Sequence, residues 1–266
     1  MALSRNFRTT YYKTLGVPVV QHIVDVDASF AALLTERAVN VPQLLKLALE
    51  LGIVPQYRAR MWLLLTEVLP PYPGLWAFVL RERRAMFEDV VDAAQVLQAK
   101  DVSEGDEASG VYYDFSALLL EDEEDTEDDV AGKTQKTPRP PSLQDLKRLV
   151  HLHRTYWKEI AACDSPLLCG MDDSDFLLGV ARVVCEVLTQ APERFWCFTR
   201  LLELFHDGLE LVDPMVTVGK LYKAQLADFE AVFLRTLDVK RRRLTADGSI
   251  SSMHKSSNDE EYGRRR

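Results

Sequence analysis

Few side chains in this sequence could bind a metal ion or perform catalysis, and their spacing favours structural roles. His151 and His153 stand two positions apart, in a segment with the apolar periodicity of a helix. Residues with that separation lie about 200° apart around a helix axis, so the two imidazoles should point to opposite faces. We therefore expect no metal site at this pair.

An acidic cluster and the cysteines are the other candidate ligands. The cluster 172–175, with sequence DDSD, lacks the glycine and the distal glutamate of a calcium loop, and it precedes an apolar segment that it could cap. The cysteines contain no C-x-x-C pair, which favours reduced and mostly buried thiols. They are Cys163, Cys169, Cys185 and Cys197.

The common signatures of nucleotide, zinc and acyl-transfer sites are absent. The chain contains no G-x-x-x-x-G-K-[ST], G-x-G-x-x-G, H-E-x-x-H or G-x-S-x-G motif, so we expect no cofactor and no self-contained active site. The net charge is −9, but the segment 121–129 alone holds eight acidic residues, which leaves the rest close to neutral. This balance argues against a nucleic-acid-binding protein.

Hydropathy predicts a globular protein without a membrane span. The chain has 266 residues, of which 47% are hydrophobic, enough for a large core. No apolar run approaches the roughly 20 residues that a transmembrane helix needs, and the N-terminus lacks the apolar core of a signal peptide. We expect a cytoplasmic protein with no transmembrane segment.

The candidate residues must be positioned by helices, because no strand-like alternation occurs and apolar residues recur at three- and four-residue spacing. The central helix should run over 56–69, between Pro55 and Pro70. In it, Arg58 precedes Trp62 by four residues, so its guanidinium could lie over the indole or reach a carboxylate on a neighbouring helix. The fold class expected is all-α.

Other helices are expected on both sides of this one. Their ranges are 6–15, 30–38, 41–51, 75–100, 142–160, 176–188, 192–208 and 214–238. In the helix 75–100 we expect the basic cluster 81–84 to face water. The residues expected to face inward there are Phe78, Phe87, Val90, Val91, Ala94 and Leu97.

Composition divides the chain into one helical domain, 5–238, with two segments expected to be disordered. The segment 101–141 is an acidic and proline-rich insertion, and 239–266 is a basic and polar tail; neither holds enough apolar residues to offset its ordering entropy. Within the insertion, the apolar island 111–120 either packs on its own domain, which we favour, or serves as a docking segment. The basic run 240–243 is most simply solvated charge; a nuclear-import signal or a contact for anionic lipid is the alternative.

Two aromatic blocks resemble those of the TBC domain, the all-helical domain of most Rab GTPase-activating proteins. The first is Arg58-x-x-x-Trp62 with its leucine-rich turn, and the second is Phe195-Trp196-Cys197-Phe198. The resemblance covers 5–238 apart from the insertion and implies a TBC-like multi-helix domain without its C-terminal lobe. The truncation should leave an apolar face without its usual cover. That face includes Leu226, Phe229 and Phe233.

The catalytic signatures of that family are poorly matched. Active members resemble one another in I-x-x-D-x-x-R, which supplies an arginine finger, and in Y-x-Q-G, whose glutamine orients the attacking water. Here Asp145-x-x-Arg148 keeps only the spacing, and Cys169 stands at the glutamine-finger position, where a thiol cannot replace an amide. The resemblance implies a protein that is not an enzyme. The alternative is a Rab GTPase-activating protein that uses Arg148 as an arginine finger.

Within the family, the chain is most similar to a small non-catalytic member, the third subunit of the tuberous sclerosis complex. The similarity includes the N-terminal segment 5–12 and the blocks around Trp62 and Pro70. It implies an adaptor that binds a coiled coil of hamartin within the hamartin–tuberin assembly, which acts on Rheb and restrains TOR signalling. It also implies recruitment to lysosomal or other endomembranes through that complex. A small GTPase of the Rab class is the alternative partner.

Overall fold

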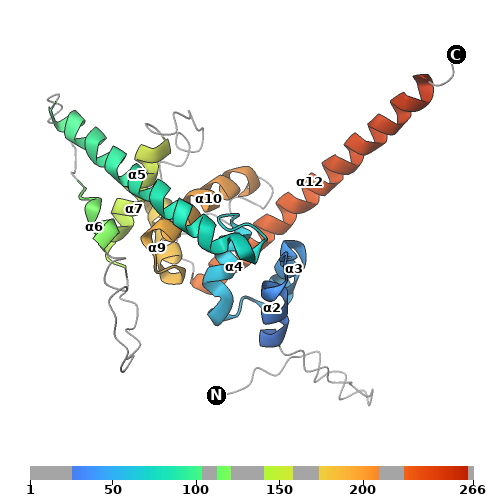
Figure 1. Ribbon diagram of the computed structural model, residues 1–266, viewed down its shortest axis with the longest axis horizontal. Helices are drawn as coiled ribbons and strands as arrows, with labels where there is room; N and C mark the ends of the chain where they lie inside the picture. The colour runs from blue at the N-terminus through green and yellow to red at the C-terminus, as the bar shows by residue number, and fades with distance from the viewer. Residues whose placement is uncertain (1–25, 104–112, 121–140, 158–173, 210–224, 263–266) are drawn as a thin grey trace.

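The computed structural model describes residues 26–103, 113–120, 141–157, 174–209 and 225–262, and within these ranges every regular element is helical (Figure 1). The predicted all-α class is therefore confirmed. The elements are α2 (Val26–Thr35), α3 (Val41–Leu51), η1 (Pro55–Tyr57), α4 (Arg58–Leu65), η2 (Pro73–Leu75), α5 (Trp76–Ser103), α6 (Ser116–Leu120), α7 (Leu143–Thr155), α9 (Ser174–Val187), α10 (Ala191–Leu209) and α12 (Leu226–Tyr262). The expected helix 6–15 lies outside the described residues.

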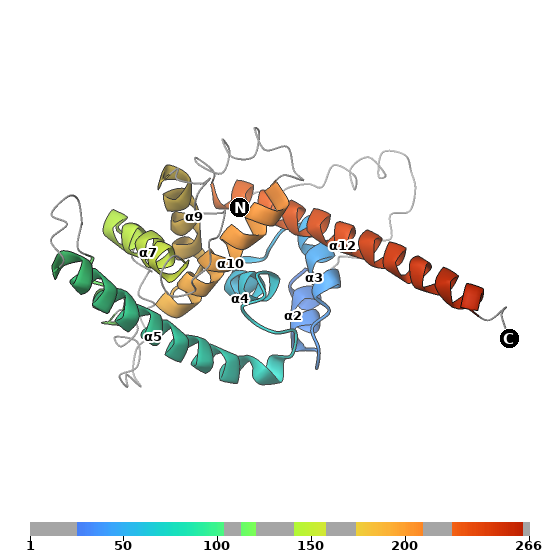
Figure 2. The same cartoon turned by 90° about the horizontal axis from the view of Figure 1, so that it is seen from above.

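Helix α4 lies at the centre of the molecule, among α3, α5, α10 and α12 (Figures 1 and 2). The 3-10 turn that begins at Pro55 leads into it, and five consecutive residues, Met61 to Leu65, are buried. It is shorter than predicted, because Glu67 adopts a left-handed φ of 60° and the chain folds back, with the Leu69 N–H donating to the Leu63 carbonyl at 2.9 Å. The reversal brings Val68 and Leu69 into the core.

Helix α10 is the main packing partner of the other helices. It contacts α4, α5, α7, α9 and α12. All four residues of the second aromatic block are buried on it, and the ring of Phe195 lies 5.5 Å from that of Phe87 on α5. The buried residues of α10 include Phe195, Trp196, Cys197, Phe198, Leu201, Leu202, Leu204 and Phe205.

Most of the residues predicted to face inward on α5 are buried, but two expectations for this helix are wrong. Phe87, Val90, Val91 and Ala94 are buried, but Phe78 is 53% exposed. Phe78 stands nine residues before Phe87, which is about 180° around a helix, so the two rings cannot face the same core.

The second correction on α5 concerns the basic cluster 81–84, which is not wholly solvated. Arg83 is half-buried, and its guanidinium lies 4.8 Å from the centre of the Trp196 ring. Burial, and then the nearby Arg200, lowers the pKa of Arg83. Since the Trp196 indole also donates to the Arg83 carbonyl at 2.9 Å, this arginine belongs to the α5–α10 contact.

The apolar island of the insertion packs on its own domain over residues 113–120. Phe115 and Leu118 are buried, and the rings of Tyr113 and Phe115 lie 4.7 and 5.8 Å from that of His151 on α7. The favoured interpretation of the island is therefore confirmed for these residues. The ranges 104–112 and 121–140 lie outside the described part, and residues 101–103 are the helical end of α5.

Helix α12 corrects two expectations. It continues to Tyr262, whereas disorder was expected from residue 239; the segment contains no proline, and Asp238 and Arg242 form an ion pair of 2.7 Å one turn apart. Of the face expected to lack cover, Phe229 and Phe233 are buried, with their rings 5.6 and 5.5 Å from that of Trp62, and Leu226 is partly buried. Among the described helices, none is both long and apolar enough to cross a bilayer.

Candidate functional site

The first aromatic block forms a buried polar contact between α4 and α12. Glu230 Oε1 accepts from the Arg58 Nε at 2.8 Å and from the Trp62 indole Nε1 at 2.9 Å. The second alternative for Arg58, a carboxylate on a neighbouring helix, is thus confirmed. Because Trp62 is fully buried, its N–H depends on this carboxylate for a partner.

The second aromatic block also lies inside the protein. Phe195 and Phe198 are fully buried, and the ring of Tyr156 meets those of Phe195 and Trp196 edge-on at 5.5 and 5.8 Å. Both blocks therefore hold helices together and present no reactive group at the surface.

Arg148, the candidate arginine finger, lies on α7 beside the start of that helix. Its guanidinium donates to Asp145 at 3.0 Å, and Asp145 forms a reciprocal capping box with Ser142. Burial acts to raise the pKa of Asp145, but the hydrogen bonds from Ser142 and the charge of Arg148 outweigh it and lower the value. The other candidate, Cys169, lies outside the described residues, so the two cannot be compared in space.

The two histidines point to different neighbours, as their spacing predicts. His151 lies against Tyr113 and Phe115, whereas the buried His153 places Nδ1 3.0 Å from the Thr199 hydroxyl. Burial lowers the pKa of His153 to about 3, which keeps the imidazole neutral. No group of three or more potential ligands that could hold a metal ion occurs in the part of the chain that the structure describes.

The buried thiol on α10 is suited to packing and not to nucleophilic chemistry. Cys197 is fully buried and accepts a hydrogen bond from the Thr66 hydroxyl at 3.8 Å. Burial raises its pKa to about 12, so the reactive thiolate is absent near neutral pH. Cys185 is partly buried on α9.

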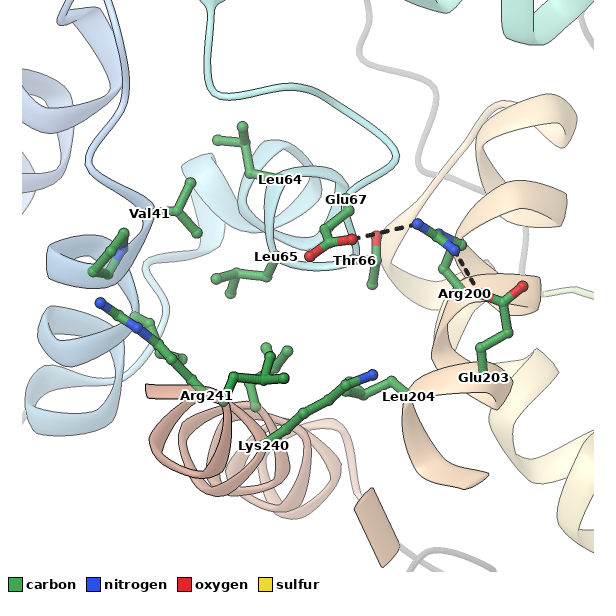
Figure 3. A pocket seen from close by; sticks show the side chains of 14 residues that line it. Val41, Leu64, Leu65, Thr66, Glu67, Arg200, Glu203, Leu204, Lys240 and Arg241 are labelled. Carbon is green, nitrogen blue, oxygen red and sulfur yellow. Dashed lines mark hydrogen bonds and ion pairs between the residues drawn. The ribbon is translucent and has the colours of Figure 1, made fainter. Parts of the chain in front are cut away.

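A cavity of about 350 Å³ lies where α3, α4, α10 and α12 meet (Figure 3). Leu45, Leu64, Leu65 and Leu204 supply a buried apolar floor. A second cavity, of about 560 Å³, continues along α3 and α12 and shares Pro42, Leu45 and Arg241 with the first. We call the two cavities together the α3–α12 groove.

Charged residues form the rim of the α3–α12 groove. Arg200 on α10 contacts Glu203 at 2.6 Å and Glu67, after α4, at 3.3 Å, as the dashed lines in Figure 3 mark. On the opposite side, Lys240 and Arg241 extend from α12 to the two sides of the cavity (Figure 3). An apolar floor between charged rims can bind apolar side chains of a partner.

This groove could not be predicted from the sequence, because its lining comes from four helices that are distant along the chain. One local signal was available. Leu237 and Leu244 are seven residues apart and lie on one face of α12, with the basic run between them. That pattern indicates an apolar stripe with basic flanks.

Comparison with known proteins shows distant and partial similarity to proteins named TBC1 domain family member 7. The chain is 29% identical to the Bos taurus protein over 139 residues, which cover 52% of this chain and 41% of that protein. It is 31% identical to the Danio rerio protein over 94 residues, or 35% of this chain and 31% of that protein. For the Homo sapiens protein the identity is 29% over 94 residues, with the same coverage.

The matches to these relatives thus span less than half of their length. Neither a protein-family model nor a solved structure matches the chain. The partial similarity, together with the all-helical fold, supports a distant relationship to proteins of the TBC-domain family.

Proposed function

We propose that this chain is a non-catalytic, TBC-like helical adaptor that binds a coiled-coil partner of the hamartin type. In this role it stabilises a tuberous-sclerosis-type complex that acts on Rheb and restrains TOR signalling. It works in the cytoplasm and reaches lysosomal or other endomembranes through its partners. Two observations support this role: the resemblance of the two aromatic blocks to those of the TBC domain, and one feature of the surface of α5.

An exposed apolar row on α5 carries the proposal. Phe78, Met86 and Val96 are 53%, 46% and 68% exposed. At about 100° per residue, Phe78 and Val96 lie at the same angle around the helix and Met86 about 80° away. The row extends for about 27 Å along the axis, which suits a long helical partner better than a small molecule.

Acidic residues interleave with the row. Glu82 and Asp89 are exposed and lie at angles between those of Phe78 and Met86. Exposed apolar side chains with charged neighbours are the pattern by which helices pack along a coiled coil while remaining compatible with water. A coiled coil laid along α5 would cover the apolar side chains and keep the carboxylates at its edges.

The test is size-exclusion chromatography with light scattering on the full chain, alone and with the C-terminal coiled coil of hamartin from the same organism. Co-elution at defined stoichiometry is expected for the wild type. Phe78→Asp and Met86→Asp should abolish it, whereas Leu143→Asp, at an exposed leucine on α7, should not. Co-elution that persists in both α5 variants would refute this surface.

The alternative function is GTPase activation through Arg148. The guanidinium of this residue is partly exposed, so a bound GTPase could reach it. A panel of Rab GTPases should show no faster GTP hydrolysis with the chain than without it. Acceleration that disappears in Arg148→Ala and Arg148→Lys would replace the adaptor proposal by the enzymatic one.

A further inference from the structure

The contact face of α12 continues beyond the helix that it packs against. Glu230 and Phe233 lie on this face and contact Trp62 of α4. Leu237, Arg241 and Leu244 lie within about 60° of one another around α12, on the same side as Glu230. Since Leu244 is 65% exposed, the apolar stripe extends past its cover and becomes one wall of the α3–α12 groove.

The charges of the groove favour an acidic occupant. Three of its four acidic lining residues, Glu67, Glu203 and Asp238, are engaged in ion pairs with Arg200 or Arg242. The fourth, Glu50, follows Lys46 by four residues on α3, a spacing that places the two side chains on the same side of the helix. On the α12 side, Arg241 lines both cavities and lies three residues before Leu244, so this wall adds positive charge to the groove.

The shape of the groove favours a helix over a membrane or a strand. Its floor is recessed between α3 and α10, where the side chains of a partner helix can reach but a lipid surface cannot (Figure 3). The described residues form no sheet, so they offer no edge to which an extended peptide could add. A helix placed along α12 can insert apolar residues from one stripe and direct acidic ones to the rim.

We propose that the α3–α12 groove binds an amphipathic helix of a partner protein, with apolar residues at positions i, i+3 or i+4, and i+7, and with acidic residues beside them. The apolar stripe covers Leu244 and the leucine floor, and the acidic residues pair with Arg241. This site lies on helices other than α5, so it is distinct from the surface proposed for the coiled coil and does not depend on it.

The test selects from a displayed library of helical peptides of about 15 residues, long enough to form four turns. The bait is the full chain. Selected sequences should combine the apolar spacing with an excess of Asp and Glu. One selected peptide is then synthesised with a fluorescent label, and its Kd is measured by anisotropy, together with that of the same peptide carrying Lys in place of its acidic residues.

Groove variants and matched controls locate the site. Leu244→Gln and Arg241→Glu should each weaken binding by about tenfold or more, and added salt should reduce the effect of the second. Val96→Gln, at an exposed apolar residue of α5, and Arg235→Glu, at an exposed arginine of α12 outside the groove, should leave Kd within about twofold.

Several outcomes would overturn the proposal. These are selection of sequences without acidic residues, equal binding of the Lys-substituted peptide, or unchanged affinity in both groove variants. Binding to phosphatidylserine vesicles in preference to the peptide would assign the basic wall to a membrane instead.

Because Met86→Asp affects only the α5 row, loss of coiled-coil binding in that variant with intact peptide binding would separate the two surfaces.

Discussion

Removal of the Glu230 carboxylate should destabilise the protein because two donors share one of its oxygens. The Trp62 indole is fully buried, so Glu230→Ala leaves its N–H without a partner, at a cost of about 1–3 kcal/mol. Arg58 is 25% exposed, so water can replace much of its contact, which adds only about 0–1 kcal/mol. The free energy of unfolding should fall by about 1–4 kcal/mol in total.

A conservative variant isolates the role of the acceptor oxygen. Glu230→Gln keeps the size of the side chain and one carbonyl oxygen, so the indole retains a partner and the loss should be about 1 kcal/mol. Arg235→Ala, at an exposed position on the same helix, should change stability by less than about 0.5 kcal/mol. Urea unfolding followed by far-UV circular dichroism measures all three. The reasoning fails if the Ala and Gln variants lose equal stability, or if Glu230→Ala matches the exposed control.

Other predictions follow from single contacts. Ser142→Ala removes the capping hydrogen bond to Asp145 and should cost about 1 kcal/mol in urea unfolding. Because burial lowers the pKa of His153 to about 3, only the unfolded chain takes up this proton between the two pKa values. The imidazole of the unfolded chain has a pKa of about 6.5, so the free energy of unfolding should be fully retained above that pH. At pH about 5 the free energy of unfolding should be lower by about 2 kcal/mol, and the decrease should be smaller in His153→Gln. Glu67 has a left-handed φ, so Glu67→Val should be less stable than Glu67→Gly by about 1–2 kcal/mol in the same assay.

Local signals in the sequence predicted the helix boundaries that depend on neighbouring residues. Asn40 and Ser142 cap α3 and α7 as Asn and Ser commonly do, and Gly52 ends α3 with a φ of 79°. These features could be predicted because each depends on residues within one or two turns.

Other features depend on contacts across the chain, which periodicity cannot resolve. The partner of Arg58 was left open because Glu230 is 172 residues away. Phe78 was placed inside because its type is apolar, although its angle opposes that of Phe87. The residues that cover Phe229 and Phe233 could not be predicted either, because Trp62 and Phe205 contact them from helices far away along the chain.

The contact at Glu230 and the proposed groove are mechanically linked, because one face of α12 serves both. Glu230 fixes that face on α4, and Arg241, eleven residues later, lies only about 20° away around the helix. If α12 rotates when the anchor is lost, the groove wall rotates with it. Glu230→Ala should therefore raise the Kd of the peptide. Ser142→Ala destabilises α7, which does not line the groove, so it should leave the Kd of the folded protein unchanged.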